Sequence, residues 1–167
     1  FIQIDSAAKH ALAAHHDNIE AALPFALDQF YRAVREAPEV RRFFSDEAHI
    51  QGAKTAQMKH WSRILRGEFD AEYVASVTRI GETHARIGLE PRWYIGGYTL
   101  ILDYLVRVIV ASSLKRGPFE KARDVSDAVA TLLKCAMLDM DFVISTYLDA
   151  AEKARVESER AAIERSE

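Results

Sequence analysis

Glycine and proline are scarce in this chain of 167 residues, and they divide it into segments of helical length. They lie at Pro24, Pro38, Gly52, Gly67, Gly81, Gly88, Pro91, Gly96, Gly97, Gly117 and Pro118. A β-sandwich or barrel would need turn residues about every 8–12 positions. Between the breaks, apolar residues recur at helical spacing, as in Leu23, Leu27, Tyr31 and Val34, with no sustained alternation of period two. We therefore predict an all-α protein.

Helices are expected over residues 5–20, 22–36, 39–44, 47–66, 70–87, 91–115 and 119–165. Pro24 and Pro91 should lie in opening turns, where a missing N–H is tolerated. Gly88 should end a helix in the left-handed conformation. Asp70 or Ser45 could cap the helix that follows each of them.

The last segment is too long for a single domain body. From Phe119 to Glu167 there is neither glycine nor proline, so a continuous helix would span about 70 Å, whereas a domain of this size is roughly 30–40 Å across. In residues 152–167 nine of sixteen side chains are charged, and Val156 and Ile163 stand seven apart, as at the start of a coiled-coil seam. We expect a domain over residues 1–151 and, over 152–167, a helical linker to an output domain. A frayed, solvated tail is the alternative.

Charge and composition exclude several classes of protein. A net charge of −3 and a pI near 6.1 give no reason to expect nucleic acid as a partner. The single cysteine, Cys135, excludes an internal disulfide and a cysteine-based zinc site. No HExxH, CxxC or glycine-rich phosphate loop is present, which argues against hydrolytic and phosphoryl-transfer chemistry. No apolar run is expected to reach the roughly 18 residues that a membrane span requires.

The segment TLILDYLVRVIVASSL is apolar nearly all round, interrupted mainly by Asp103 and Arg107. Such a helix is buried on more than one side. Together with the apolar face of the last helix, it is our candidate for a homodimer contact built as a helical bundle.

Six histidines are present, and His84 differs from the others in where it points. His10, His15 and His16 are expected to face solvent, whereas His84 continues an apolar helical stripe and should face the interior. An interior imidazole must find a backbone carbonyl, a water or a metal. One turn earlier, Gly81 would leave room for a flat ring.

Two aromatic residues, Trp93 and Tyr94, follow the turn after His84 and should lie beside its imidazole. Tyr31 is a second interior polar group, on the stripe of Leu23, Leu27 and Val34. Its hydroxyl needs a partner when buried. That partner could be a backbone carbonyl or a functional ligand.

Three segments carry a resemblance to a known family. They are GETHARIGLEPRWYIGGY (81–98), HWSRILRGEFDAEY (60–73) and LDQFYRAVREAPEVRRFF (27–44), and the similarity extends over about residues 20–148. These segments resemble the sensor domain of the globin-coupled sensors, bacterial haem proteins related to protoglobin. The resemblance implies a globin-like fold that lacks the D helix, with an extra N-terminal helix, a long C-terminal helix, and haem b between the E and F helices.

The resemblance also implies roles for individual residues. His84 matches the proximal axial ligand of the haem iron, and Tyr31 the distal tyrosine that donates a hydrogen bond to bound O2. Tyr94 matches the tyrosine packed against the proximal imidazole. Phe43 or Phe44 would lie near the haem edge, and Ile87 completes the expected cofactor-binding residues. A phenolic donor favours O2, which takes on negative charge at ferrous haem, over carbon monoxide, which takes on little.

The distal side departs from some relatives, which carry a second polar residue there. The matching positions in this sequence are Ala53 and Ala56, and Thr55 or Gln57 could substitute if the helix is rotated. His60 could be a second axial ligand. It also stands next to Trp61, as in a His-Trp pair that the family keeps away from the iron.

We therefore expect a cytoplasmic, homodimeric, haem-based O2 sensor domain that signals to an output module such as a diguanylate cyclase, a histidine kinase or a chemoreceptor. It should have no catalytic activity of its own. Two alternatives stay open: a cofactor-free helical dimerisation or docking module, and a haem protein that turns over O2 or peroxide.

Overall fold

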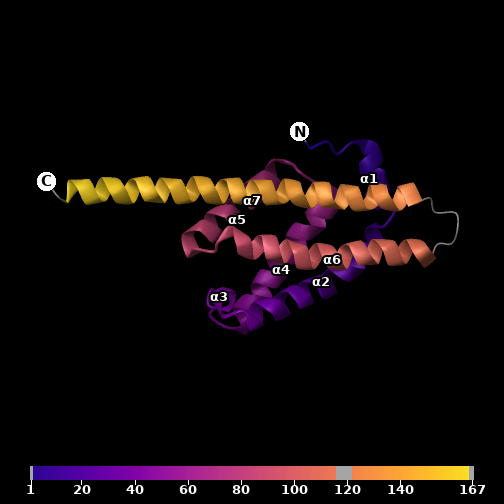
Figure 1. Cartoon of the computed structure of the whole chain (residues 1–167), viewed down its shortest axis with the longest axis horizontal. Helices are drawn as coiled ribbons and strands as arrows, with labels where there is room; N and C mark the ends of the chain where they lie inside the picture. Colours follow the sequence, from indigo (N-terminus) through magenta and orange to yellow (C-terminus); the bar gives the residue numbers. More distant parts are fainter. Residues whose placement is uncertain (1, 116–121, 166–167) are drawn as a thin grey trace.

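The computed structural model describes residues 2–115 and 122–165, and these residues form seven helices and no strand (Figure 1). The helices are α1 (Ser6–Ala13), α2 (His16–Glu36), α3 (Pro38–Arg41), α4 (Glu47–Arg66), α5 (Ala71–Ile87), α6 (Pro91–Lys115) and α7 (Ala122–Glu164). The all-α prediction is confirmed. No helix lies between α3 and α4, as expected for a globin without a D helix. Gly117, Pro118 and residues 119–121, where the last helix was expected to begin, lie outside the described residues.

Local signals set the ends of α5. The Asp70 carboxylate accepts a hydrogen bond from the backbone N–H of Tyr73 at 2.8 Å and caps the first turn. At the other end Gly88 adopts φ +75°, and the N–H of Leu89 donates to the carbonyl of His84 at 2.9 Å. Both ends lie where the sequence predicted them, so the last turn of α5 is held in a defined position.

Ser45 does not cap α4. The N-cap is Asp46, whose carboxylate accepts from the N–H of His49 at 2.8 Å, while the Ser45 hydroxyl donates to Asp46. A carboxylate near the positive end of a helix gains from the helix dipole as well as from the hydrogen bond, which explains why the neighbouring aspartate takes this place.

The predicted boundary between a first helix over residues 5–20 and a second over 22–36 was wrong. Pro24 lies inside α2, and the chain turns at Ala14 and His15 instead. Within a helix of 21 residues a proline removes one hydrogen bond, and the burial of Leu23 and Leu27 on the same helix offsets this loss. His15, expected to face solvent, is 1% exposed, and its Nδ1 lies 3.1 Å from the Ser112 hydroxyl.

The helices pack in pairs: α5 and α1 against α7, α2 against α6, and α6 against α7. Helices α6 and α7 run side by side in opposite directions, and the C-terminal part of α7 extends well beyond the other helices (Figure 1). The side chains of this extension are exposed almost throughout. The expected projection of the last helix is therefore present.

Gly81 has a different role from the one expected. A Cβ added there would lie 2.7 Å from the Cβ of Thr146 and 2.9 Å from the carbonyl oxygen of Val143, both on α7. Such separations are below normal contact distances, so the missing side chain lets α5 and α7 approach closely. It does not leave room for a flat ring beside His84. Gly97 has a similar role on α6, where an added Cβ would lie 2.5 Å from the ring of Phe30 on α2.

Helix α6 is long and apolar enough to cross a membrane by length and composition, with a mean hydropathy of 1.5 over its most apolar window. The expectation that no stretch would reach this length was wrong. Core helices of globular domains share this composition. In this fold α6 packs against α2 and α7 through buried residues such as Tyr98, Ile101 and Leu105.

Candidate functional site

The imidazole of His84 projects from the last turn of α5 into a largely apolar environment. Burial lowers the pKa of this imidazole to about 4, so it is neutral at pH 7. Its Nδ1 atom is buried and has no hydrogen-bond partner among the described residues. A buried polar atom without a partner is costly, so this nitrogen, one of several such atoms among the described residues, needs an explanation.

Tyr94, on the first turns of α6, stacks on His84. The two ring centroids are 5.0 Å apart and the ring planes differ by 26°. The Tyr94 hydroxyl is also buried without a hydrogen-bond partner in the described part of the chain. Burial, with a smaller effect of Tyr147, raises the pKa of Tyr94 to about 12. A neutral phenol ring therefore fixes the plane of a neutral imidazole.

Tyr31, on α2, belongs to a separate apolar cluster. That cluster consists of Tyr31, Val34 and Ile50, with Phe30, Val40, Phe44 and Ala53 packed against it. The Tyr31 ring is 4% exposed and makes edge contacts with Phe30 and Phe44, with centroids 4.8 and 6.3 Å away. Burial raises the pKa of Tyr31 far above its ordinary value, so the hydroxyl keeps its proton and can donate.

The structure distinguishes between the alternatives at the edge of this cluster. Phe44 contacts Tyr31, whereas the ring of Phe43 is covered by the Arg42 guanidinium at 5.0 Å. Of the two candidates, Phe44 is thus the aromatic residue beside Tyr31. Ala53 packs against the same cluster.

Neither polar substitute nor His60 adds a donor to the cluster of Tyr31. Thr55 is exposed and its hydroxyl donates to the carbonyl of Gln51 on its own helix, and Gln57 is half-buried. The Nε2 of His60 is bonded to Asp139 on α7 at 2.7 Å. Among the described residues, the surroundings of Tyr31 are therefore apolar.

These residues fit a flat, apolar cofactor that brings its own metal. The described residues contain no cluster of His, Cys, Asp and Glu able to hold a bare metal ion. A metal that used His84 would therefore have to carry most of its ligands itself, as iron in a porphyrin does.

Two further observations agree with such a cofactor. The described interior forms two apolar clusters, with Tyr31 in the smaller and Tyr94 in the larger, and helices α4 and α5 are not among the closely packed pairs. Ile87, one turn after His84, is 40% exposed although it is apolar. A planar cofactor would cover such a surface.

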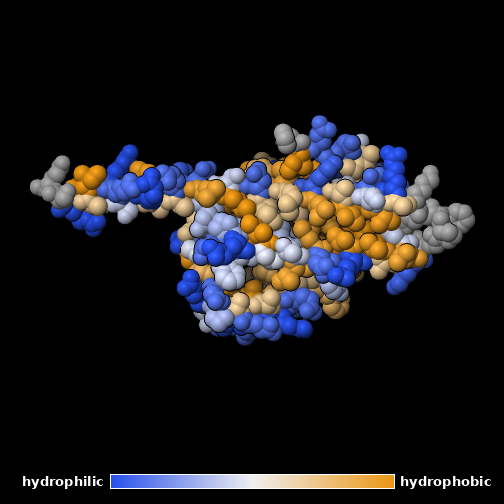
Figure 2. Space-filling model, viewed as in Figure 1, coloured by the Kyte–Doolittle hydropathy of each residue, from blue (hydrophilic) through white to orange (hydrophobic). Residues whose placement is uncertain are grey.

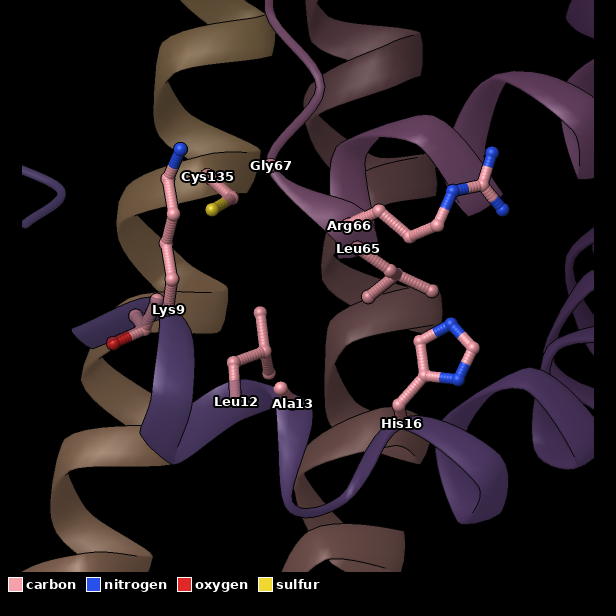
Figure 3. Close-up of a pocket in the computed structure, with 9 residues that line it drawn as sticks. Lys9, Leu12, Ala13, His16, Leu65, Arg66, Gly67 and Cys135 are labelled. Carbon is pink, nitrogen blue, oxygen red and sulfur yellow. The ribbon is translucent and has the colours of Figure 1, made fainter. Parts of the chain in front are cut away.

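A cavity elsewhere in the fold does not include this site. It measures about 170 Å³ and is lined by Lys9, Leu12, Ala13, His16, Leu65, Arg66, Gly67, Thr131 and Cys135 (Figure 3). Lys9 and Arg66 lie on opposite sides of this view, and the Cys135 thiol lies beside Lys9. Neither His84 nor Tyr31 contributes to its wall.

A buried polar network that the sequence analysis missed joins four helices. Asp139 on α7 is 0% exposed, and its carboxylate accepts hydrogen bonds from His60 on α4, Tyr73 on α5 and Tyr98 on α6. The ring of His60 also stacks on Tyr73, with centroids 5.6 Å apart. Helical spacing could have located Asp139, since it lies three residues after Ala136 and four before Val143 on the buried face of α7.

Comparison with known proteins agrees with this geometry. The sequence profile of the Protoglobin family matches residues 1–153. The heme-based aerotactic transducer HemAT of Halobacterium salinarum is 32% identical over 158 residues, which are 90% of this chain and 32% of that protein. The chain thus spans about a third of the length of this relative.

Two solved structures share the fold. The globin domain of the Geobacter sulfurreducens globin-coupled sensor matches with a TM-score of 0.71 at 18% identity, over 84% of this chain and 88% of that one. The globin domain of DosC from E. coli, in its ferric form, matches with a TM-score of 0.65 at 20% identity, over 89% and 92%. The fold is therefore that of a globin. Within that class, the chain belongs to the Protoglobin family.

The two tyrosines of α6, one turn apart, should respond differently to loss of the hydroxyl. Tyr98→Phe removes a donor to the buried Asp139 carboxylate and should lower the free energy of unfolding by about 1–3 kcal/mol. Tyr94→Phe removes a hydroxyl without a partner and should leave the stability of the cofactor-free chain unchanged or slightly higher. Urea unfolding of both variants measures this. Equal losses in the two would contradict the hydrogen-bond assignment.

Proposed function

We propose that this chain is a haem-based gas sensor domain that binds O2 at ferrous haem b between His84 and Tyr31. The observation that carries the proposal is the neutral imidazole of His84, which has a buried nitrogen without a partner and is held in plane by Tyr94. Membership of the Protoglobin family supports haem as the cofactor, and the relative from Halobacterium salinarum is named as a heme-based aerotactic transducer.

When bound, haem supplies a ferrous iron that can take up a diatomic gas. The chain's own residues set which gas is favoured. His84 would hold the haem iron through a neutral imidazole nitrogen, and stacking on Tyr94 restricts rotation of that ring. Tyr31 would donate a hydrogen bond to the bound gas from an apolar cluster against which Phe44 and Ala53 pack. A dry pocket strengthens that hydrogen bond toward a ligand that gains negative charge.

A cofactor-free docking module is the weaker alternative. In such a protein the buried imidazole of His84 would bind no metal, and its unpartnered Nδ1 would cost about 1–3 kcal/mol without serving a function. An enzyme that turns over O2 or peroxide has no supporting observation in the described residues. We assign sensing to this domain and any catalysis to an output module.

We further propose that the domain works as a homodimer through α6 and α7. Apolar side chains gather over these two adjacent helices (Figure 2). The large exposed apolar residues of these two helices include Leu100, Val110, Leu114, Leu133, Met137 and Leu148. A second copy would cover this face and close a four-helix bundle.

The expected division of the chain, a domain over residues 1–151 and a linker over 152–167, is part of this proposal. The exposed, charged end of α7 supports it, and so does the relative of about three times this chain's length. An output domain would follow the linker. The single cysteine, Cys135, is a buried free thiol, as is usual in the reducing cytoplasm, where we place the protein.

His84→Ala tests the cofactor. Purified wild-type chain mixed with hemin should show the sharp absorption bands of a protein-bound haem, and the variant should lose them on gel filtration because its axial ligand is gone. His10→Ala, at an exposed histidine of α1, is the control and should retain haem. A wild-type chain that takes up no haem would support the docking module.

Tyr31→Phe tests the distal donor. Loss of a hydrogen bond to a charged acceptor is worth about 1.5–3 kcal/mol, so O2 should dissociate about 10–100 times faster. Carbon monoxide dissociation should change far less. Tyr104→Phe, at a half-buried tyrosine of α6, should change neither rate. Equal acceleration for both gases in stopped-flow measurements would exclude a donor role for Tyr31.

The double substitution Leu133→Glu and Met137→Glu tests the dimer. Each side chain is 41% exposed in the isolated chain, and four carboxylates buried across the bundle would repel one another. Light scattering should show a dimer for the wild type and a monomer for the variant. Lys134→Glu, at a neighbouring exposed position, should leave the dimer intact. A dimer that survives the double substitution would place the interface elsewhere.

A further inference from the structure

We propose that the buried carboxylate of Asp139 couples the haem-facing ends of three helices to α7, and thereby transmits the ligation state of the site to the projecting end of that helix. The inference rests on the proposed function. It concerns the network of His60, Tyr73, Tyr98 and Asp139, none of which belongs to the candidate haem site.

Each of the three donors shares a helix with a residue of that site. Tyr73 lies at the start of α5, about three turns before His84 on the same face. Tyr98 lies one turn after Tyr94 on α6, and His60 two turns after Ala53 on α4. A backbone-hydrogen-bonded helix is stiff over this length. A displacement of His84, Tyr94 or Ala53 therefore also displaces a residue that donates a hydrogen bond to Asp139.

The carboxylate cannot follow one donor without losing another. Its Oδ1 accepts from both His60 and Tyr73, and its Oδ2 accepts from Tyr98. Asp139 is completely buried, so water does not replace a lost partner. Burial and the Asp139 charge raise the pKa of both tyrosines far above the ordinary value, so both remain donors. The network thus favours a small number of discrete arrangements over gradual deformation.

The position of Asp139 on α7 suits this role. Val143 and Thr146, one and two turns later, are in close contact with α5 at Gly81. Beyond them α7 leaves the body of the domain (Figure 1). Asp139 is therefore among the last buried positions of α7 before the projecting segment, where an imposed shift or rotation is carried outward.

The test compares Asp139→Asn with wild type in the haem-loaded full chain. Asparagine replaces one accepting oxygen by an NH2 group, which cannot accept, and keeps the shape of the side chain. Asp141→Asn, an exposed carboxylate two residues away, is the matched control. The readout is hydrogen–deuterium exchange of residues 144–164 in the ferrous protein with and without O2, together with the haem spectrum and the O2 dissociation rate.

We expect the wild type and Asp141→Asn to show a ligand-dependent difference in exchange over residues 144–164. Asp139→Asn should reduce that difference about fivefold or more, the lower end of typical coupling between sites, while the spectrum stays unchanged and O2 dissociates within about twofold of the wild-type rate. A purely structural role would change exchange equally in both ligation states.

Should Asp139→Asn fail to fold, Tyr73→Phe and Tyr98→Phe each remove one donor and leave the carboxylate, and each should reduce the difference. An undiminished difference in Asp139→Asn, or in both tyrosine variants, overturns the inference, as does a wild type without any ligand-dependent difference. In those cases haem is still bound and the proposed function stands. A chain that takes up no haem overturns both.

Discussion

The fold depends on one buried negative charge. A carboxylate removed from water destabilises a protein by several kcal/mol unless hydrogen bonds surround it, and Asp139 has three donors, from α4, α5 and α6. These helices must therefore converge at one point on α7. The opposite ends of α4 and α5 are not tied there, and they carry Ala53 and His84. Hydrogen bonds to Asp139 thus hold α4 and α5 together at one end, and the ends that carry Ala53 and His84 remain available for a ligand.

The parts of the fold set by neighbouring residues could be predicted from the sequence. The turn after His84 needs only Gly88 in the left-handed conformation and Pro91 at the first position of α6. Both residues were identified from the sequence. Tyr31 was placed in the interior by its spacing, and Tyr94 beside the imidazole. Spacing alone did not tell whether the polar groups of His84 and Tyr31 make core hydrogen bonds or bind a ligand. The family resemblance favoured a ligand.

The parts set by distant residues could not be predicted in the same way. Asp139 meets its partners across 79, 66 and 41 residues of sequence, and helical periodicity tells which face is buried but not what lies opposite. Gly81 shows the same limit, because the sequence reveals a missing side chain but not that α7 takes the space. At Pro24 a local rule was overridden, because apolar burial along α2 outweighed one lost hydrogen bond.

The length of α7 has a mechanical consequence. From Asp139 to Glu164 the helix runs about 38 Å without a break. A tilt of about 5° at its anchored end would displace the far end by about 3 Å, as much as a rearranged hydrogen bond spans. A small tilt of the buried part of α7 would thus become a larger displacement at its exposed end, where another domain could respond to it.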